Sequence, residues 1–428
     1  MNIRRHEWAA PEDLSAGIRE WFGRGIDPVD VSPIAKAVAD EGDAALVRLT
    51  NEFDATAQPL ETVAVSLDEA DDALKALDEE VEAALNLAFK NVSAVASAQL
   101  DDDEKAVELP QGQTVTVGEV SVAAAGIYAP GGRASYPSTV VMGCATARVA
   151  GVRRLVLVTP PGPDGKINAT TLAAASICGV DEIYAVGGAQ AIFALARGTQ
   201  TIRAVDVIAG PGNNWVQAAK KVVFGEVAID SLAGPSDLMV FLDETVDVEL
   251  AALDLCAQAE HGEESLLVAV GSSDEVLNRL EAEVNRVAAE EPSVFDCRLA
   301  TVVAPNAEVA IDLANEFAPE HLQLMDDESA ALAGRVRTAG CVFLGPTSAT
   351  AFGDYIAGSN HILPTDGTGR SFGPLSPATF RRRTAQVSLD AAAARNLAGP
   401  LDALARAEGL PVHGKSATRR ADKSENNE

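Results

Sequence analysis

Short apolar runs, most of them followed closely by glycine or proline, recur through the middle of this chain, and a helical pattern follows each of them. They lie at 155–158, 183–186, 205–208 and 238–241. Repetition of a buried strand, a turn and a helix is typical of right-handed βαβ units, whose strands form a mainly parallel sheet. A second set follows, with runs at 266–270 and 341–344 and a helical stretch at 274–290. The sequence therefore predicts an α/β fold with two mainly parallel sheets.

The rest of the chain has other patterns. Apolar residues at three- and four-residue spacing predict helices between residues 29 and 97, and alternation at 114–122 predicts strands. The first 24 residues predict a short helical arm that packs on a larger body. Beyond residue 374 helical patterns return at 391–397 and 401–408, and the polar end of the chain, 419–428, is expected to be disordered.

Length and charge limit the function classes. A chain of 428 residues is long enough for two or three domains. Its formal net charge of −30 argues against nucleic-acid binding, because phosphate neutralisation requires basic clusters. The apolar runs are far shorter than the ~20 residues of a membrane-spanning helix, and the start lacks the apolar core of a signal peptide. We expect a cytoplasmic protein whose acid excess reflects either a soluble surface or adaptation to high salt.

The five cysteines are far apart and form no Cys-x-x-Cys pair. A disulfide framework and a thiolate zinc site are therefore not indicated. We expect these cysteines to be small buried residues. They are Cys144, Cys178, Cys256, Cys297 and Cys341.

Four of the five histidines lie in short segments that also contain acids or amides, at 258–261, 319–321, 358–361 and 408–413. Imidazole is a common metal ligand and the side chain whose unperturbed pKa lies nearest neutrality. Histidines beside Gln, Glu and Asn therefore suggest a nitrogen and oxygen metal site that also moves protons. This pattern favours an enzyme.

Gln258 and His261 are three residues apart at the end of a helical segment. That spacing places both side chains on one side of a helix, where they can share a cation. An alternative is that His261 only caps the helix end before Gly262. Asp354 and His413 supply the remaining ligand types, although either residue can equally be a cap or a surface residue.

Glu320 and His321 are the best acid/base candidates, because neighbouring titratable groups in one cleft can have their pKa values driven apart. A salt-bridged surface pair is the alternative. His361 is either a contact to a polar substrate or a turn cap. We expect His6 to be a surface residue.

Glycine turns at strand ends are the candidate cofactor site. They lie at 126–132, 187–190 and 210–213, whereas no Gly-x-Gly-x-x-Gly opens a helix after a strand. Ligands of parallel α/β sheets bind beyond the carboxyl ends of strands, where helix N-termini and backbone amides favour anions. Each turn taken alone can also be an ordinary tight turn.

Taken together, these segments resemble the histidinol dehydrogenase family from about Asn2 to Thr418. The resemblance is carried by the strings GIYAPGG, VGGAQAI, GPGN, LAGPS, QAEH, APEHL, GDYIAGSNHILP and EGLPVH. It implies an intertwined homodimer. Each subunit would have two incomplete Rossmann-like domains and small helical N- and C-terminal domains. The implied division is an arm at 1–24, a first α/β domain at 25–125 and 237–373, an inserted second domain at 126–236, and a tail domain at 374–428.

The resemblance also implies residue roles and a reaction, the oxidation of L-histidinol to L-histidine by two NAD with one zinc ion per subunit. It implies zinc ligands at Gln258, His261, Asp354 and His413, and an acid/base pair at Glu320 and His321. It implies NAD contacts at Tyr128, Gln190 and Asn213. The implied substrate contacts are Ser236, Gln258, His261, His321, Asp354, His361, Glu408 and His413, with the last two reaching the partner's active site.

Two other functions remain possible. A related zinc and NAD dehydrogenase of another small polar alcohol, such as a sulfonated propanediol, would keep the zinc and acid/base residues. It would differ around Ser236, His361 and Glu408. A non-catalytic zinc or metabolite-binding protein would not need Glu320 beside His321.

Overall fold

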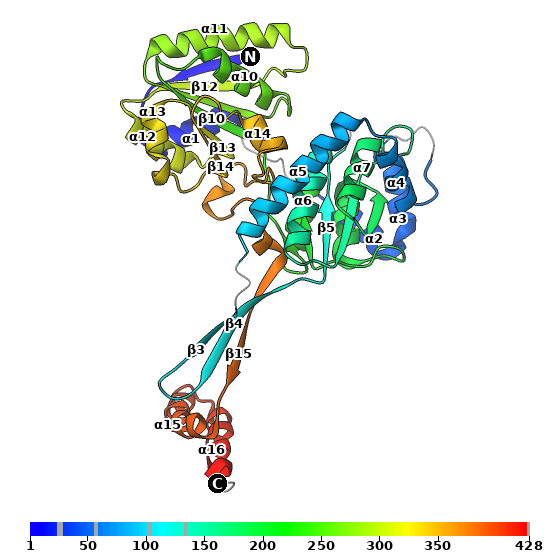
Figure 1. Ribbon diagram of the computed structural model, residues 1–428, viewed down its shortest axis with the longest axis vertical. Coiled ribbons are helices and arrows are strands. Elements are labelled where there is room, and N and C mark those ends of the chain that lie inside the picture. The colour runs from blue at the N-terminus through cyan, green and yellow to red at the C-terminus, as the bar shows by residue number, and fades with distance from the viewer. Residues whose placement is uncertain (24–28, 55–58, 101–103, 132–134, 426–428) are drawn as a thin grey trace. The chain divides into compact units, whose positions relative to one another are not determined.

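The computed structural model describes residues 1–23, 29–54, 59–100, 104–131 and 135–425 (Figure 1). The chain divides into two compact units. The first unit contains residues 1–99 and 123–380, and the second contains residues 100–122 and 381–428. Within the described ranges, no helix is long and apolar enough to cross a membrane.

The first sheet of the first unit is parallel throughout, with strand order β1-β12-β11-β10-β13-β14. Alternate residues of its apolar strands pack on opposite layers of helices, so both faces are buried. Helices α10 and α11 cover one face, and α1 and α12 cover the other. The strands are β1 (Asn2–His6), β10 (Asp237–Leu242), β11 (Leu266–Gly271), β12 (Arg298–Val303), β13 (His321–Leu324) and β14 (Cys341–Leu344). The helices are α1 (Pro11–Phe22), α10 (Val248–Ala259), α11 (Asp274–Glu290), α12 (Ala307–Phe317), α13 (Asp327–Ala331) and α14 (Thr350–Tyr355).

The second sheet has the order β2-β7-β6-β5-β8-β9 and is parallel except for β2. Helices α2, α3, α8 and α9 share its largest apolar cluster, while α6 packs on β5 and β6 from the other side with α5 and α7 beside it. The strands are β2 (Ala64–Val65), β5 (Ala124–Tyr128), β6 (Arg154–Thr159), β7 (Glu182–Ala185), β8 (Val207–Ala209) and β9 (Ala228–Ile229). The helices are α2 (Ser32–Glu41), α3 (Asp43–Phe53), α4 (Leu67–Lys75), α5 (Glu79–Ala98), α6 (Pro137–Val149), α7 (Ala169–Ile177), α8 (Gly188–Arg197) and α9 (Asn214–Val223).

The second unit combines an antiparallel sheet with a pair of helices. Its strands β3 (Lys105–Glu108), β4 (Thr114–Ser121) and β15 (Arg381–Ser388) pair in the order β15-β4-β3. Helices α15 (Ala391–Ala407) and α16 (Pro411–Glu425) pack on each other. Short 3-10 turns in the first unit, at Ala333–Arg335, Thr368–Arg370 and Pro377–Phe380, complete the secondary structure.

These sheets confirm the expected α/β class, but the division of the chain differs from the expected one. Residues 2–6, expected in a helical arm, form the edge strand β1 of the first sheet. Helices α2 to α5, expected with the first sheet, belong instead to the second, and β2 pairs with β7. The strand at 114–121 pairs with β15 in the second unit. Amphipathic spacing identifies the buried face of a helix but not the sheet that buries it, which explains these differences.

The C-terminal segment also differs from its expected structure. The stretches expected at 391–397 and 401–408 form one helix, α15, with Pro400 inside it. Helix α16 continues to residue 425 where disorder is expected, and it packs against α15. The expected domain boundary at residues 24 and 25 and the last three residues, 426–428, lie outside the described residues. The five cysteines are free, and all are buried except the half-buried Cys341.

The connection between the two sheets positions the candidate site. Strand β9 is the last strand of the second sheet along the chain, and β10 of the first sheet follows it, with only residues 230–236 between them. A segment of this length spans about 25 Å at most when fully extended. The carboxyl edge of the second sheet therefore lies near the amino edge of the first.

A buried ion pair holds the start of this connection. Lys220 and Asp230 lie 2.5 Å apart, and their side chains are 1% and 5% exposed. The Lys220 ammonium also donates to the Gly210 carbonyl at 2.7 Å, and Asp230 accepts from the Gly210 amide at 2.7 Å. The pair thus satisfies both backbone groups of Gly210, whose positive φ of 126° favours glycine. It fixes the Gly-Pro-Gly-Asn turn after β8.

Replacing Asp230 with alanine should destabilise the first unit by about 3–5 kcal/mol, because it leaves a buried ammonium without a counter-charge. Urea denaturation followed by tryptophan fluorescence would measure the change. Asp40→Ala is the control, since the Asp40–Lys36 pair is exposed and should contribute nothing measurable. Equal stability of both variants would show that the buried pair does not hold the turn.

Candidate active site

A cavity of about 350 Å³ lies in the first unit, between the two sheets. Residues from the carboxyl edge of the second sheet, including Gly210 and Asn213, line one wall. Ser236, Glu320 and His321, which lie at the amino edge of the first sheet, line the other. The remaining predicted site residues in its lining are His261, Asp354 and His361. Residues far apart in the sequence are therefore brought into one polar cavity.

The predicted acid/base pair lies where strand β13 begins. Both residues are buried, with Glu320 6% and His321 3% exposed. The His321 Nδ1 atom lies 3.8 Å from Glu320 Oε2, and its Nε2 atom lies 3.2 Å from Asp354 Oδ1. Nδ1 is buried and has no hydrogen-bond partner among the described residues. The alternative of a surface salt bridge is therefore wrong, and Nδ1 is the ring atom free to exchange a proton with a ligand.

Burial and neighbouring charge shift the pKa values of these groups in identifiable ways. Burial raises the pKa of Glu320 to about 8. For His321 burial lowers the pKa, but the negative charges of Glu320 and Asp354 outweigh it and raise the pKa to about 9. For Asp354 burial is outweighed by the hydrogen bond to His321 and by the charges of the histidines, so its pKa is lowered. The cavity therefore holds an ionised Asp354 beside two groups that titrate in the range useful for proton transfer.

His361 connects the two walls of the cavity. Its Nδ1 atom lies 2.6 Å from the Asp354 carbonyl oxygen, so Nδ1 donates, and Nε2 accepts from the Thr139 hydroxyl at 3.1 Å. Burial lowers the pKa of His361, which favours this neutral ring. Thr139 belongs to α6 of the second sheet, whereas Asp354 belongs to α14 beside the first. His361 therefore orients Asp354 and bridges the sheets, and a substrate contact at Nε2 would replace the Thr139 bond.

The predicted metal ligands are only partly brought together. Gln258 is buried in the last turn of α10, and its Nε2 atom has no hydrogen-bond partner in the part of the chain that the structure describes. Nearby His261 reaches the surface at the rim, where desolvation lowers its pKa and the charge of Asp354 opposes this. Among the described residues, no three His, Cys, Asp or Glu side chains form a metal-binding cluster. An imidazole and an ionised carboxylate that line one cavity nevertheless fit an incomplete metal site, to which Gln258 would add its amide oxygen.

The predicted cofactor contacts lie at the carboxyl edge of the second sheet. Tyr128 ends β5, and its hydroxyl accepts from the Gly188 amide at the start of α8 at 3.2 Å. Gln190 is buried in the first turn of α8. Asn213 caps α9, and its side chain accepts from the amides of Trp215 and Val216. Only Asn213 of the three predicted contacts lines the cavity itself. The glycine turns and two helix N-termini meet at this edge, which is where parallel sheets bind anionic ligands.

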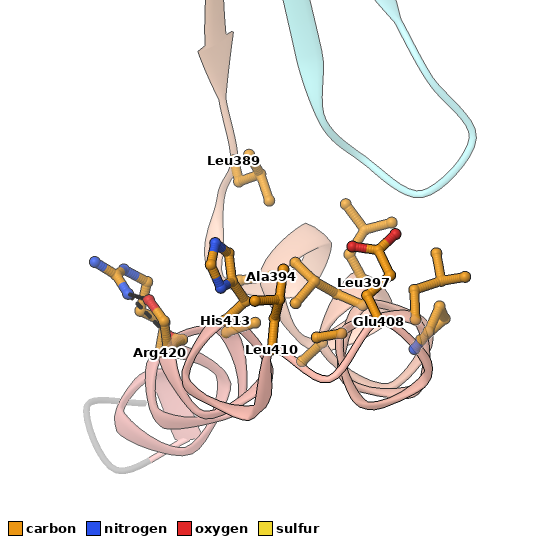
Figure 2. A pocket seen from close by; sticks show the side chains of 14 residues that line it. Leu389, Ala394, Leu397, Glu408, Leu410, His413 and Arg420 are labelled. Carbon is orange, nitrogen blue, oxygen red and sulfur yellow. Dashed lines mark hydrogen bonds between the residues drawn. The ribbon is translucent and has the colours of Figure 1, made fainter.

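Glu408 and His413 lie in the second unit. Glu408 is the C-cap of α15, and His413 lies in the first turn of α16. Both line an apolar groove of about 790 Å³, and Figure 2 shows the two side chains pointing to the same side of the helix pair. Leucines 389, 397, 401, 404 and 410 also line the groove. The fourth predicted metal ligand is therefore on a different unit from the other three.

The sequence alone did not single out several residues that shape the cavity. Thr139 holds the imidazole of His361, and Asp237 exchanges hydrogen bonds with Glu320. Asp237 is the first residue of the otherwise apolar strand β10 and is fully buried. An acid at the start of a buried strand was the available signal. Thr139 gave none, because a threonine in an apolar helix is unremarkable without its partner.

Known proteins resemble this chain over nearly its whole length. The family model described as histidinol dehydrogenase matches residues 27–421. A histidinol dehydrogenase of Synechococcus sp. is 42% identical over 397 residues, which are 91% of each chain. One of Haloarcula marismortui is 40% identical over 433 residues, covering 98% of this chain and 100% of the relative. The crystal structure of histidinol dehydrogenase from Elizabethkingia anophelis superimposes with a TM-score of 0.90 at 30% identity, covering 99% of this chain and 98% of that one. The chain belongs to the histidinol dehydrogenase family.

Proposed function

We propose that this protein is a zinc-dependent, cytoplasmic histidinol dehydrogenase. It oxidises L-histidinol to L-histidine through L-histidinal, with two NAD⁺ and one water, in the final step of histidine biosynthesis. One observation carries the proposal. His321 lies between Glu320 and Asp354 in a cavity whose opposite wall is built from the glycine turns of the second sheet. Family membership supports the choice of substrate.

The residues divide the work between two oxidations. In the first, the neutral form of His321, whose population grows as the pH rises towards its pKa of about 9, takes the hydroxyl proton of the alcohol at Nδ1 while a hydride leaves the carbon for NAD⁺, which gives the aldehyde. In the second, water adds to the aldehyde carbon and Glu320 takes the proton that the water loses. A second hydride then leaves for another NAD⁺ and the acid is formed. Glu320 Oε2 and His321 Nδ1 are 3.8 Å apart, so both groups can serve one reacting carbon in turn.

Gln258, His261 and Asp354 would hold zinc together with His413 of the partner subunit. Bound zinc would anchor the amine and imidazole of the substrate and fix the alcohol carbon near His321. The lowered pKa of Asp354 supports this assignment, and Gln258 would bind through its amide oxygen. Tyr128, Gln190 and Asn213 would contact NAD⁺. Ser236, His361 and Glu408 would complete the substrate pocket.

We also propose that the active site is shared within a homodimer. The groove that contains Glu408 and His413 is lined by leucines, of which Leu404 is 67% exposed. A small unit does not bury such a face alone, so the groove is suited to pack on a partner. In the shared site Glu408 and His413 come from one chain and Gln258, His261, Glu320 and Asp354 from the other.

A related dehydrogenase of a sulfonated propanediol is the second candidate, since the zinc and acid/base residues would be common to both. NADH formation with L-histidinol and with the sulfonated diol, measured side by side, distinguishes the two. The proposal expects turnover of L-histidinol and none of the diol. The reverse preference would overturn the choice of substrate. A non-catalytic binding protein is disfavoured, because burying Glu320 beside His321 has a cost that binding alone does not require.

Chelation should abolish NADH formation from L-histidinol, and added zinc should restore it. The reason is that Gln258, His261, Asp354 and His413 offer nitrogen and oxygen ligands with room for the donors of the substrate. NADH absorbance and elemental analysis of the same sample would check this. Full turnover by a preparation shown to be free of metal would contradict the zinc assignment.

Glu320→Gln should slow oxidation of supplied L-histidinal by about 10²-fold or more and oxidation of L-histidinol to the aldehyde much less, because only the second step consumes water. His321→Asn should slow proton removal in the first step. Single-turnover NADH formation from each substrate separates the two rates. Glu316→Gln, at a half-buried acid of α12 that pairs with Arg370, is the control and should leave both rates unchanged. Equal losses for Glu320→Gln in both steps would refute the division of roles.

Inactive His261→Ala and inactive His413→Ala chains should regain part of the activity when they are unfolded and refolded together. A heterodimer of the two would contain one intact site and one site with both substitutions. Differently tagged chains allow the heterodimers to be purified before NADH formation is assayed. Verified heterodimers that stay as inactive as either parent would show that each site is built within one chain.

A further inference from the structure

The amino ends of β10 and β13 are joined by two hydrogen bonds that each involve a side chain. The backbone amide of Asp237 donates to Glu320 Oε2 at 3.0 Å, and the amide of Glu320 donates to Asp237 Oδ1 at 2.5 Å. Leu238 and His321, the next residues along, are regular partners in the parallel ladder. At the amino ends of these two strands, side-chain carboxylates therefore accept the hydrogen bonds that backbone carbonyls accept further along the ladder.

The second oxygen of Asp237 is also held. Oδ2 accepts from the backbone amide of Asp366 at 3.2 Å, and Asp366 adopts a positive φ of 52°. The Asp366 carboxylate pairs with Arg19 at 2.8 Å, and the Arg19 guanidinium lies 4.1 Å from the centre of the Phe317 ring. Asp237 itself has no exposed surface. Its carboxylate is therefore fixed at both oxygens by groups from separate loops.

Glu320 is fixed on one side only. Oε2 accepts from the Asp237 amide, whereas no hydrogen bond to Oε1 occurs among the described residues. Glu320 also lines the cavity. The arrangement holds one oxygen of the carboxyl group and leaves the other available to a ligand or a water molecule in the cavity.

Two adjacent buried acids at the amino ends of neighbouring strands are unfavourable, because each opposes the ionisation of the other. Burial raises the pKa of Asp237 to about 6, and the charge of Arg19 opposes this rise. An apolar residue at position 237 would continue the pattern of β10 and bury no charge. A buried acid that is costly for stability and holds Glu320, a residue of the cavity wall, is consistent with a role in the reaction.

We infer that Asp237 is a positioning residue, which acts through Glu320 by fixing its backbone and the direction of its carboxyl group. This inference rests on the proposed function, in which Glu320 takes a proton from the water that adds to the aldehyde. Asp237 touches neither the substrate nor the cofactor. Its effect should therefore appear in the aldehyde step and should depend on the presence of Glu320.

A double-mutant cycle in the holoenzyme tests this dependence. Asp237→Asn keeps the shape of the side chain and one acceptor oxygen, but its amide group opposes the Asp366 amide and shifts the carboxyl group of Glu320. Oxidation of supplied L-histidinal should slow about 10- to 100-fold, as for other small misplacements of a catalytic group. In the Glu320→Gln background the same substitution should slow it less than about twofold further.

Asp326→Asn is the matched control. Asp326 is a buried acid just beyond the opposite end of β13, and both its oxygens accept hydrogen bonds from Ser329. It should lower the thermal unfolding temperature but leave both oxidation rates within about twofold, since it does not contact Glu320. If Asp237→Asn does not fold, Asp237→Glu carries the cycle, because its added methylene also displaces the carboxylate that holds Glu320.

The possible outcomes separate the two ideas. If Glu320→Gln alone leaves the aldehyde step unchanged, the proposed role of Glu320 fails, and the inference fails with it. If Glu320→Gln slows that step but the Asp237 variant does not, only the inference is overturned. Equal losses from the Asp237 variant with and without Glu320 would show a purely structural role and would also overturn it.

Discussion

The cavity between the two sheets depends on one constraint of the backbone, the short connection from β9 to β10. Because residues 230–236 are all that separates the sheets, the carboxyl edge of the second sheet lies near the amino edge of the first. A carboxyl edge supplies helix N-termini and backbone amides, which suit an anionic cofactor. The amino edge supplies Glu320 and His321. Each sheet therefore contributes what the other lacks, and the reaction is proposed to occur between them.

The electrostatics of the cavity follow from this arrangement. Acids that would be solvated on a surface are buried at the start of β10 and β13, so the pKa of Glu320 is raised and the negative charge around His321 raises the pKa of that residue as well. The ion pair of Lys220 and Asp230 differs from these acids, because its two charges neutralise each other. It fixes the turn at Gly210. One wall is thus rigid and the other can titrate, which a sequence of two oxidations in one site requires.

Much of the fold could be predicted from the sequence, and the exceptions have physical reasons. Apolar runs such as 155–158 and 266–270 predicted strands because both faces of a parallel sheet are buried. Strands β1 and β13 were not recognised, since Asn-Ile-Arg-Arg-His and His-Leu-Gln-Leu lack an apolar run. Helix spacing at 29–97 predicted helices but not the sheet that they cover. The end of helix α16, from residue 419, was expected to be disordered, because its charged sequence does not reveal that α16 packs on α15.

The candidate site could be predicted in part, because chemistry limits which residue types can serve it. The segments around Glu320, His321 and Asp354 suggested acid/base and metal chemistry, and the structure brings these three side chains together. The roles of Asp237 and Thr139 depend on contacts between distant segments, which one sequence does not reveal.

The central claim is that one cavity carries out both oxidations. The most direct test is to count the NADH formed for each L-histidinol consumed, with the product identified by mass spectrometry. If one cavity carries out both oxidations, each L-histidinol should yield two NADH and L-histidine, with no free aldehyde. One NADH per substrate and release of L-histidinal would contradict it.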